Sequence, residues 1–319
     1  KTSVPAIFIP ISKDEIKRIP DCLATELKKF LKLRVKQNDF SADRLEVLST
    51  YSQDKNSPEL VFFVGLGKKS EIDLSLAKDL GGKLAKLAKQ HKKTEVSAIL
   101  HEDLNEFSQD FLESYLSVQY SPAHFKTTKK KKDYSTKTLH LIPSSITKEL
   151  KSAVDEALVI AEASNFVKRL VNSPANIINP KTLAEEAVRV AKKNRYKKVV
   201  LGDKQLKKLG CGGILAVNSG SDQEAKMIVL EHNGGKRGEK PIVLVGKGVI
   251  FDTGGYNLKP TGSMETMQQD MAGGATVLGV FHALKSLGIK RNVVAVVPVV
   301  QNMVNEHAYR PSDVITMYS

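Results

Sequence analysis

Four charged side chains between residues 247 and 270 have the types and spacing that a metal-assisted site needs. They are Lys247, Asp252, Lys259 and Asp270. Lys247 lies inside the apolar run VGKGVIF, where a buried lysine is costly unless it is paired or neutralised. A nearby cation, like burial, lowers the pKa of an ammonium group, so the neutral amine could bind the ion. All four residues lie near the end of an apolar strand, where α/β folds collect their ligands.

Each of these residues also has an ordinary structural explanation, and spacing alone leaves both open. Lys247 could reach water from a strand end marked by its flanking glycines, or it could pair with a carboxylate. Asp252 fits a turn before the next glycine pair, Asp270 fits a helix N-cap, and Lys259 fits an exposed loop. Lys247 and Asp252 are an odd number of residues apart, so they converge only if the strand bends.

The elements around these residues predict an α/β fold in the second half of the chain. We expect helices over 144–174, 179–194 and 271–289. Asn179 is the expected N-cap of the second helix, with Pro180 in its first turn. We expect strands over 197–202, 212–218, 225–233, 240–251 and 291–302. Strands this continuously apolar are buried on both faces, as in a largely parallel or mixed sheet that helices cover.

The first half of the chain also alternates strands and helices, which is typical of a layered α/β domain. The strands are expected over 60–66, 95–100 and 138–143, and the helices over 74–93 and 103–120. A length of 319 residues fits about two domains.

Composition indicates a globular protein and leaves nucleic-acid binding open. The chain is 41% hydrophobic, and no apolar run approaches the roughly 18 to 20 residues that span a bilayer, so no membrane contact is expected. The net charge of +14 invites a DNA-binding interpretation, but we favour the interpretation that the lysines are spread over solvated helix faces. The densest cluster, Lys129–Lys132, lacks interleaved aromatic residues, so we interpret it as an exposed connector.

Two further features bear on the compartment. The two cysteines, Cys22 and Cys211, make neither a disulfide framework nor a metal knuckle. The first residues, KTSVPAIFIPISKDE, carry no secretory signal pattern. We therefore expect a cytoplasmic protein.

The run VGKGVIFDTGGYNLKP, followed by METMQQDMAGGATVLG, resembles the signature region of the leucyl aminopeptidase (M17) family, also called cytosol aminopeptidases. The similarity extends through FVKRLVNSPANIINPKTLAEEA, LKKLGCGGILAVNSGS and PVVQNMVNEHAYRPSDV. It covers roughly residues 120–319 and is weaker before them, where VGLGKK is the best landmark.

The resemblance implies a two-metal aminopeptidase that hydrolyses the N-terminal peptide bond of peptides, with metal-activated water and a leucine-type preference. At matching positions, Lys247, Asp252 and Asp270 would be metal ligands, with Asp252 bridging both ions. Lys259 would be the catalytic lysine that polarises the scissile carbonyl, and it would contact the substrate together with Asp270. Met267 would line the pocket for the first side chain. Oxygen ligands with one amine suit Zn²⁺ or Mn²⁺, with Mg²⁺ or Co²⁺ as alternatives.

The family resemblance also implies a domain organisation. A small N-terminal α/β (macro-like) domain would occupy 1–143 and end in a basic connector, and a linking helix would occupy 144–172. A larger α/β catalytic domain, with a mixed central sheet covered by helices, would occupy 173–319. The family further implies a homohexamer, and some bacterial members have a DNA-binding accessory role.

One motif of the family is not found. It is an NTDAEGR-like segment that supplies further metal ligands and an arginine that holds a bicarbonate. The sequence stops at DVITMYS, before the place where this motif is expected. We therefore expect activity to require a C-terminal segment that these residues do not include. The sequence would then be an incomplete chain, which we favour, or a truncated product without activity.

Overall fold

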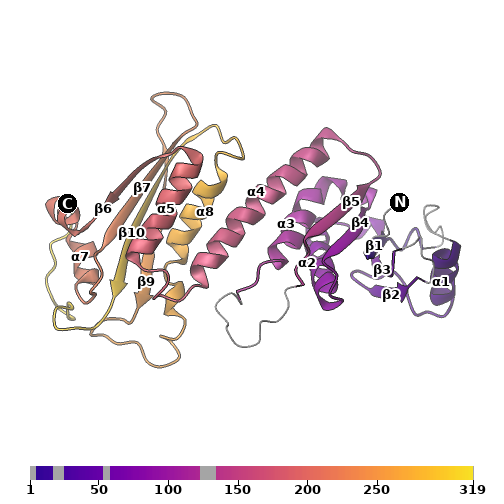
Figure 1. Cartoon of the computed structure of the whole chain (residues 1–319), viewed down its shortest axis with the longest axis horizontal. Coiled ribbons are helices and arrows are strands. Elements are labelled where there is room, and N and C mark those ends of the chain that lie inside the picture. Colours follow the sequence, from indigo (N-terminus) through magenta and orange to yellow (C-terminus); the bar gives the residue numbers. More distant parts are fainter. Residues whose placement is uncertain (1–4, 17–24, 53–57, 123–133, 319) are drawn as a thin grey trace. The chain divides into compact units, whose positions relative to one another are not determined.

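The computed structural model describes residues 5–16, 25–52, 58–122 and 134–318. The chain divides into two compact units, Lys1–Ala161 and Glu162–Ser319. Each unit has its own mixed sheet with helices beside it (Figure 1), which confirms the predicted α/β class. The lysine cluster at 129–132 and Cys22 lie outside the described residues.

The N-terminal unit is built on a sheet with the strand order β2-β3-β1-β4-β5. Its strands are β1 (Ala6–Ile11), β2 (Val47–Tyr51), β3 (Leu60–Gly65), β4 (Glu95–Leu100) and β5 (Thr138–Pro143). Strand β2 is antiparallel to β3, and the other neighbouring pairs are parallel. Strand β3 is buried along its whole length, as its uninterrupted apolar sequence predicts.

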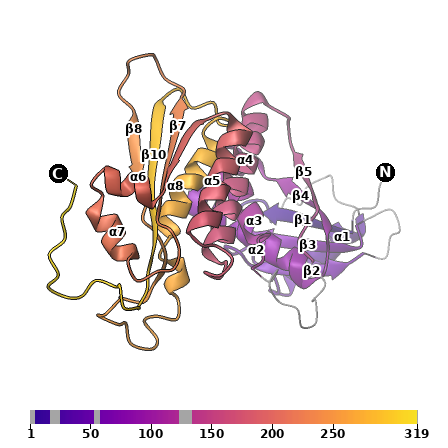
Figure 2. The same cartoon turned by 60° about the vertical axis from the view of Figure 1, so that its left-hand side comes forward.

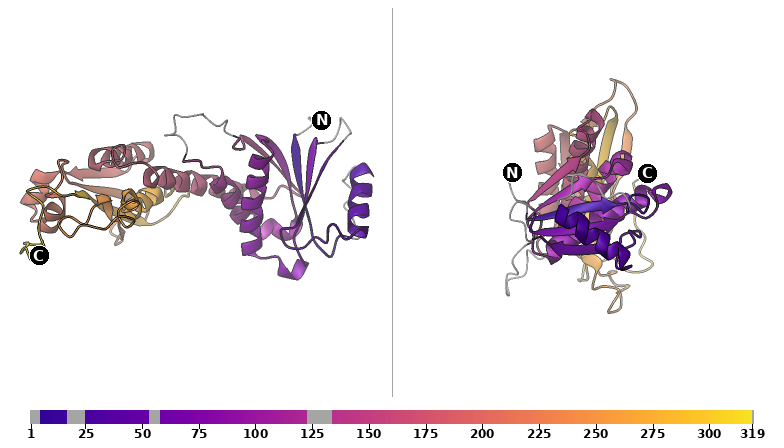
Figure 3. Two further views of the ribbon diagram at one scale, coloured as in Figure 1. Left: turned by 90° about the horizontal axis from the view of Figure 1, so that it is seen from below. Right: turned by 90° about the vertical axis from the view of Figure 1, so that its right-hand side faces the viewer.

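Helices cover both faces of this first sheet (Figure 3, left). They are α1 (Thr25–Lys36), α2 (Leu74–Gln90) and α3 (Ser108–Val118), with 3₁₀ turns η1 (Lys69–Glu71) and η2 (Glu102–Phe107). Leu27 and Leu31 of α1 pack with Phe63 on one face, and α2 and α3 pack with Phe8 and Phe62 on the other. The expected helix over 103–120 therefore begins later, as α3, after a 3₁₀ turn.

Helix α4 (Lys148–Val171) contributes to both hydrophobic cores. Leu150, Val154 and Ala157 pack into the core of the N-terminal unit. Phe166 and Leu170 pack into the core of the C-terminal unit. The predicted long helix is confirmed, and its apolar residues serve two separate cores.

The C-terminal unit has a sheet with the order β6-β7-β10-β8, and β9 also pairs with β10. Its strands are β6 (Lys197–Leu201), β7 (Lys226–Asn233), β8 (Ile242–Val245), β9 (Gly248–Asp252) and β10 (Asn292–Asn302). Strands β8 and β9 run parallel to β10, whereas β7 runs antiparallel to both β10 and β6. The single strand expected over 240–251 is therefore wrong, because the chain leaves the ladder between Val245 and Gly248.

Helices α5 (Pro180–Asn194) and α8 (Ala272–Ala283) cover one face of this second sheet (Figure 2). The Asn179 side chain accepts a hydrogen bond from the Thr182 amide, which confirms the predicted N-cap of α5. The opposite face carries only a small cluster around α6 (Asp203–Lys208) and α7 (Gly212–Asn218). Strands β6 and β8 are mostly exposed, so the expectation of burial on both faces is wrong for both of them.

Residues 212–218 form helix α7, and the predicted strand there is wrong. The run GGILAVN is short and apolar, and periodicity does not distinguish a short buried strand from a helical turn. In the structure Ile214, Leu215 and Val217 pack with Val300 of β10. No helix among the described residues is both long enough and apolar enough to cross a membrane.

Candidate functional site

Lys247 lies in the break between β8 and β9. Its carbonyl accepts a hydrogen bond from the Gly274 amide in the first turn of α8, at 2.7 Å. A Cβ atom on Gly246 would lie 2.7 Å from the Gly273 carbonyl oxygen, so the glycine is what allows α8 to approach here. The break turns the Lys247 side chain outward, and it is 59% exposed. The expectation of a lysine buried inside a strand is therefore wrong.

The Lys247 ammonium faces Asp270, with Nζ 2.8 Å from Oδ2. Asp270 directly follows the 3₁₀ turn η4 (Met267–Gln269), and α8 begins after Met271. Asp270 is therefore not the N-cap of α8. Its Oδ2 atom is buried and accepts no hydrogen bond in suitable geometry from the part of the chain that the structure describes, although Lys247 lies within ion-pair distance. A buried carboxylate oxygen with unused acceptor capacity is available for a further cation.

A second lysine–aspartate pair lies at the carboxyl end of β9. Lys259 Nζ donates to Asp252 Oδ2 at 2.6 Å, and their side chains are 28% and 17% exposed. Asp252 Oδ1 accepts from Asn302 Nδ2 at 2.7 Å and from the Gly254 amide at 3.0 Å. The backbone amide of Lys259 donates a hydrogen bond to the Thr253 carbonyl at 2.9 Å, and this bond closes the loop between the two residues.

These contacts set the charge of Asp252. Burial raises the pKa of its carboxyl group. The hydrogen bonds from Lys259, Gly254 and Asn302, with the positive charge of Lys259, outweigh burial, so the pKa lies below its ordinary value. Asp252 is therefore an anion at neutral pH.

The structure thus arranges the four predicted residues as two pairs on neighbouring segments, since β9 packs against η4. Among the described residues no hydrogen bond or ion pair joins one pair to the other. Met267 is half-buried at the start of η4, three residues before Asp270.

Two family models together match most of the chain. The model of the cytosol aminopeptidase family, catalytic domain, matches residues 165–319. The model of the same family's N-terminal domain matches residues 14–129. The chain belongs to the cytosol aminopeptidase family.

Curated relatives agree with this family. A probable cytosol aminopeptidase of Bacillus licheniformis is 31% identical over 291 residues, which are 89% of this chain and 59% of that protein. One of Stutzerimonas stutzeri is 35% identical over 301 residues, or 91% of this chain and 60% of that protein. The present chain therefore spans less than two thirds of the length of these relatives.

Solved structures share the cytosol aminopeptidase fold seen here. The bottromycin maturation enzyme BotP aligns over 98% of this chain and 62% of its own, with a TM-score of 0.76 and 23% identity. The same enzyme in complex with Mn aligns with a TM-score of 0.77. At this level of identity the likeness establishes the fold.

The sequence reasoning missed Asn302, whose amide contacts Asp252. Asn302 ends a long apolar run, and an amide side chain at such a strand end is the signal that could have found it. To use that signal one must know how β10 pairs with β9, because a register shift places Asn302 opposite Asp252. The primary sequence does not contain that register.

The residues present fit a divalent cation as part of a coordination shell. Lys247 offers an amine, and Asp252 and Asp270 offer carboxylate oxygens, one of which has no hydrogen-bond partner. This donor set, without thiolates, suits Zn²⁺, Mn²⁺, Mg²⁺ or Co²⁺. The described part of the chain contains no group of three or more His, Cys, Asp or Glu side chains that could hold a metal ion.

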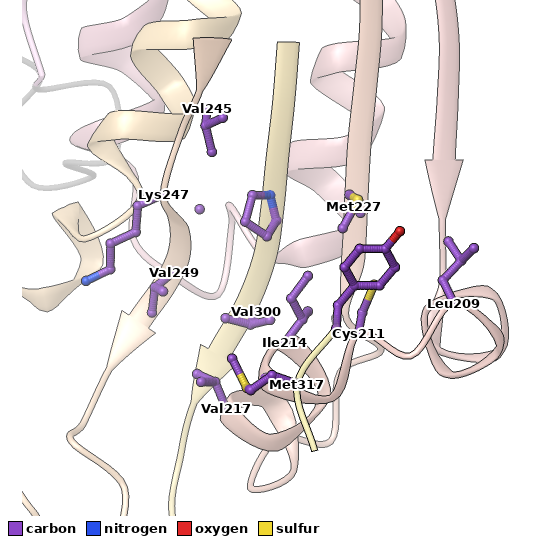
Figure 4. Close-up of a pocket in the computed structure, with 14 residues that line it drawn as sticks. Leu209, Cys211, Ile214, Val217, Met227, Val245, Lys247, Val249, Val300 and Met317 are labelled. Atoms are coloured by element: carbon purple, nitrogen blue, oxygen red, sulfur yellow. The ribbon is translucent and has the colours of Figure 1, made fainter. Parts of the chain in front are cut away.

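An apolar cavity of about 770 Å³ lies beside β9 and β10, on the sheet face that carries α7. Ile214, Val249, Val300 and Met317 are among its lining residues. Lys247 is at its edge, but Figure 4 shows its ammonium end directed away from the other lining side chains. Met267 does not line this cavity, so a role for Met267 in substrate binding stays a prediction.

Proposed function

We propose that the protein is a two-metal aminopeptidase that removes N-terminal residues from peptides. The observation that carries the proposal is the pair of lysine–aspartate contacts beside β9, in one of which the buried Oδ2 of Asp270 faces Lys247 but accepts no hydrogen bond in suitable geometry from the described residues. Membership of the cytosol aminopeptidase family supports the same reaction.

In this proposal Lys247, Asp252 and Asp270 would hold the ions. When bound, divalent ions lower the pKa of a water molecule and polarise the scissile carbonyl group. Asp252 is already ionised at neutral pH, so it needs no proton loss before it can serve as a ligand. Asp270 would contribute its buried Oδ2, which faces the Lys247 ammonium at 2.8 Å and accepts no hydrogen bond in suitable geometry from the described residues.

Lys259 supplies the positive charge for the reacting carbonyl. Its ammonium group lies 2.6 Å from Asp252, so its charge is placed beside the proposed ions. As negative charge develops on the carbonyl oxygen, this ammonium can donate a hydrogen bond to it. Removal of one such donor typically lowers the rate by about 10² to 10³.

Met267 is proposed to contact the first side chain of the substrate, together with Lys259 and Asp270. A half-buried methionine three residues before the proposed ligand Asp270 suits an apolar side chain. This supports a leucine-type preference. Zn²⁺ or Mn²⁺ is the proposed metal, and a structural neighbour named as a complex with Mn supports divalent metal use.

Other properties enter the proposal through the family alone. They are a cytoplasmic location, a homohexamer, a bicarbonate at the site and metal ligands from a segment beyond these residues. The names of the relatives, cytosol aminopeptidases, support the location.

Hydrolysis of a leucyl chromogenic amide by the full-length protein tests the proposal. After chelation, added Mn²⁺ or Zn²⁺ should restore activity to the wild type and to Asp222→Ala, which changes an exposed aspartate of the same unit. Asp252→Ala should remain inactive with either metal. An inactive wild type under every metal would remove the aminopeptidase proposal.

The net charge of +14 supports DNA binding as a second candidate function. A DNA complex held by charge has an affinity whose logarithm falls linearly with the logarithm of salt concentration. Binding to duplex DNA at low salt, with an affinity that falls linearly in this way as salt is added, would support this function. Absence of retention at low salt would exclude it.

A further inference from the structure

We propose that Asn302 is a positioning residue that fixes the orientation of the Asp252 carboxylate for cation binding. This inference rests on the proposed metal-dependent function. It assigns a role to a residue of β10, whereas the predicted ligands lie on or near β9 and η4.

The two carboxylate oxygens of Asp252 accept hydrogen bonds from different kinds of donor. Oδ1 accepts from Asn302 Nδ2 at 2.7 Å and from the Gly254 amide at 3.0 Å. Oδ2 accepts from Lys259 at 2.6 Å. Two neutral donors thus hold Oδ1. Oδ2 accepts from the Lys259 ammonium, which is the only charged donor to this carboxylate among the described residues.

Rotation of the carboxylate is the motion that Asn302 limits. The terminal torsion of an aspartate has a broad energy profile, so the carboxylate turns easily unless its oxygens are held. The Gly254 amide holds Oδ1 on one side only. Without Asn302, Oδ1 could also turn toward the Lys259 ammonium, and both oxygens would then be engaged by one cationic side chain.

Asn302 is held through its backbone and by burial. The residue is 8% exposed, and its backbone carbonyl oxygen accepts from the amide and hydroxyl groups of Thr253, at 2.9 and 2.8 Å. Its Nδ2 faces a carboxylate, which can only accept, so the amide has one suitable orientation. A Cβ atom on Gly255 would lie 3.0 Å from the side-chain Oδ1, so this glycine leaves the space that the amide needs.

Asn218 shows what a purely structural asparagine does at the same strand end. It is 6% exposed. Its Nδ2 donates to the Gln223 carbonyl at 2.6 Å, and its Oδ1 accepts from the Gln301 amide at 3.0 Å. Both atoms bond to backbone, which is the usual partner of a side-chain amide. Asn302 instead directs its amide hydrogen to a side-chain carboxylate, and this difference favours a role at the site.

The experiment measures binding of Mn²⁺ alone to the full-length, chelator-treated protein by calorimetry, with the melting temperature recorded in parallel. Asn302→Leu keeps the size of the side chain and removes the donor. Loss of a group that orients a metal ligand typically weakens metal affinity by about 10- to 100-fold, and we expect a loss of that size. Asn218→Leu is the matched control, and it should lower the melting temperature without changing Mn²⁺ affinity.

Each result decides the proposal. Wild-type Mn²⁺ affinity in a folded Asn302→Leu protein would overturn it, and so would an equal loss in Asn218→Leu, which would indicate general loosening of the strand end. If Asn302→Leu does not fold, Asn302→Ala, which introduces no new contact, replaces it under the same criteria. A wild type that binds no Mn²⁺ would instead overturn the proposed function, and this inference with it.

Discussion

Lys259–Asp252 and Lys247–Asp270 are ion pairs of the same chemistry on neighbouring segments, but their surroundings differ. The Asp252 carboxylate accepts hydrogen bonds from three donors, and the side chain of its partner Lys259 is 28% exposed. Among the described residues Asp270 has only Lys247 as an ion-pair partner of its buried oxygen, and that lysine is 59% exposed. The comparison indicates that Asp252 is fixed before any ion binds, whereas Asp270 retains capacity for a new partner.

The largest expected effect separates the two lysines. Lys259→Met should lower kcat by about 10² to 10³ while Mn²⁺ still binds, because the lost ammonium is an oxyanion donor. Lys247→Met should weaken Mn²⁺ binding, so that raised Mn²⁺ restores activity. Steady-state kinetics across a Mn²⁺ titration distinguish them, with exposed Lys290→Met as control. Identical behaviour of the two variants would contradict the division of roles.

The two aspartates should differ in stability when no metal is present. Asp252→Asn replaces one acceptor oxygen by an NH₂ group, which cannot accept from the three donors around it. A buried donor left unpaired lowers the free energy of unfolding by about 1–3 kcal/mol. Asp270→Asn breaks a pair whose lysine is exposed, and such pairs contribute less than about 1 kcal/mol. Urea unfolding in chelator measures both. Equal losses of unfolding free energy would show that the pairs are held alike.

Gly255→Ala tests the space around Asn302. Gly255 has φ +64°, and its new Cβ would lie 3.0 Å from the Asn302 Oδ1. Left-handed backbone costs an alanine about 1–2 kcal/mol. Gly262→Ala is the matched control, because it has φ +88° with no atom within 4 Å of the new Cβ. We expect similar losses of unfolding free energy but weaker Mn²⁺ binding only in Gly255→Ala, and weakening in both would refute this contact.

The smallest expected effect is on acid stability. The pKa of Asp252 is lower in the folded protein than its ordinary value, so its ionised form stabilises the fold above the unfolded pKa of about 3.9. That stabilisation is lost as pH falls below about 4 through the folded pKa. Urea unfolding in chelator between pH 6 and pH 3 should show a shallower acid loss in Asp252→Asn than in the wild type. An unchanged slope would contradict the pKa direction.

Sequence patterns predicted the elements whose apolar residues follow one clear period. Helices α2, α4 and α5 and strands β3, β4, β5, β7 and β10 lie close to where they are expected, whereas α3 begins after a 3₁₀ turn. Strands β1 and β2 and helix α6 are not predicted. The run at 212–218 is predicted as a strand because six apolar and glycine residues before Asn218 satisfy either period.

The site was predictable in its residues and not in its arrangement. Lys247, Asp252, Lys259 and Asp270 stand out by type, and the structure groups them in two pairs. Which lysine faces which aspartate depends on the break after Val245 and on the register of β10, and both are tertiary features. Their roles in binding metal and substrate stay predictions.

Helix α4 has a practical consequence for anyone who wishes to express the two units separately. Family matches end at residue 129 and resume at residue 165, which suggests that the intervening segment can be cut freely. A protein ending at residue 129 would lack Leu150, Val154 and Ala157, which belong to its hydrophobic core. A boundary near Ala161 keeps these three residues with the N-terminal unit and leaves Phe166 and Leu170 with the other. A protease site inserted in α4 near Ala161 would therefore separate the two units while removing the fewest apolar side chains from either hydrophobic core.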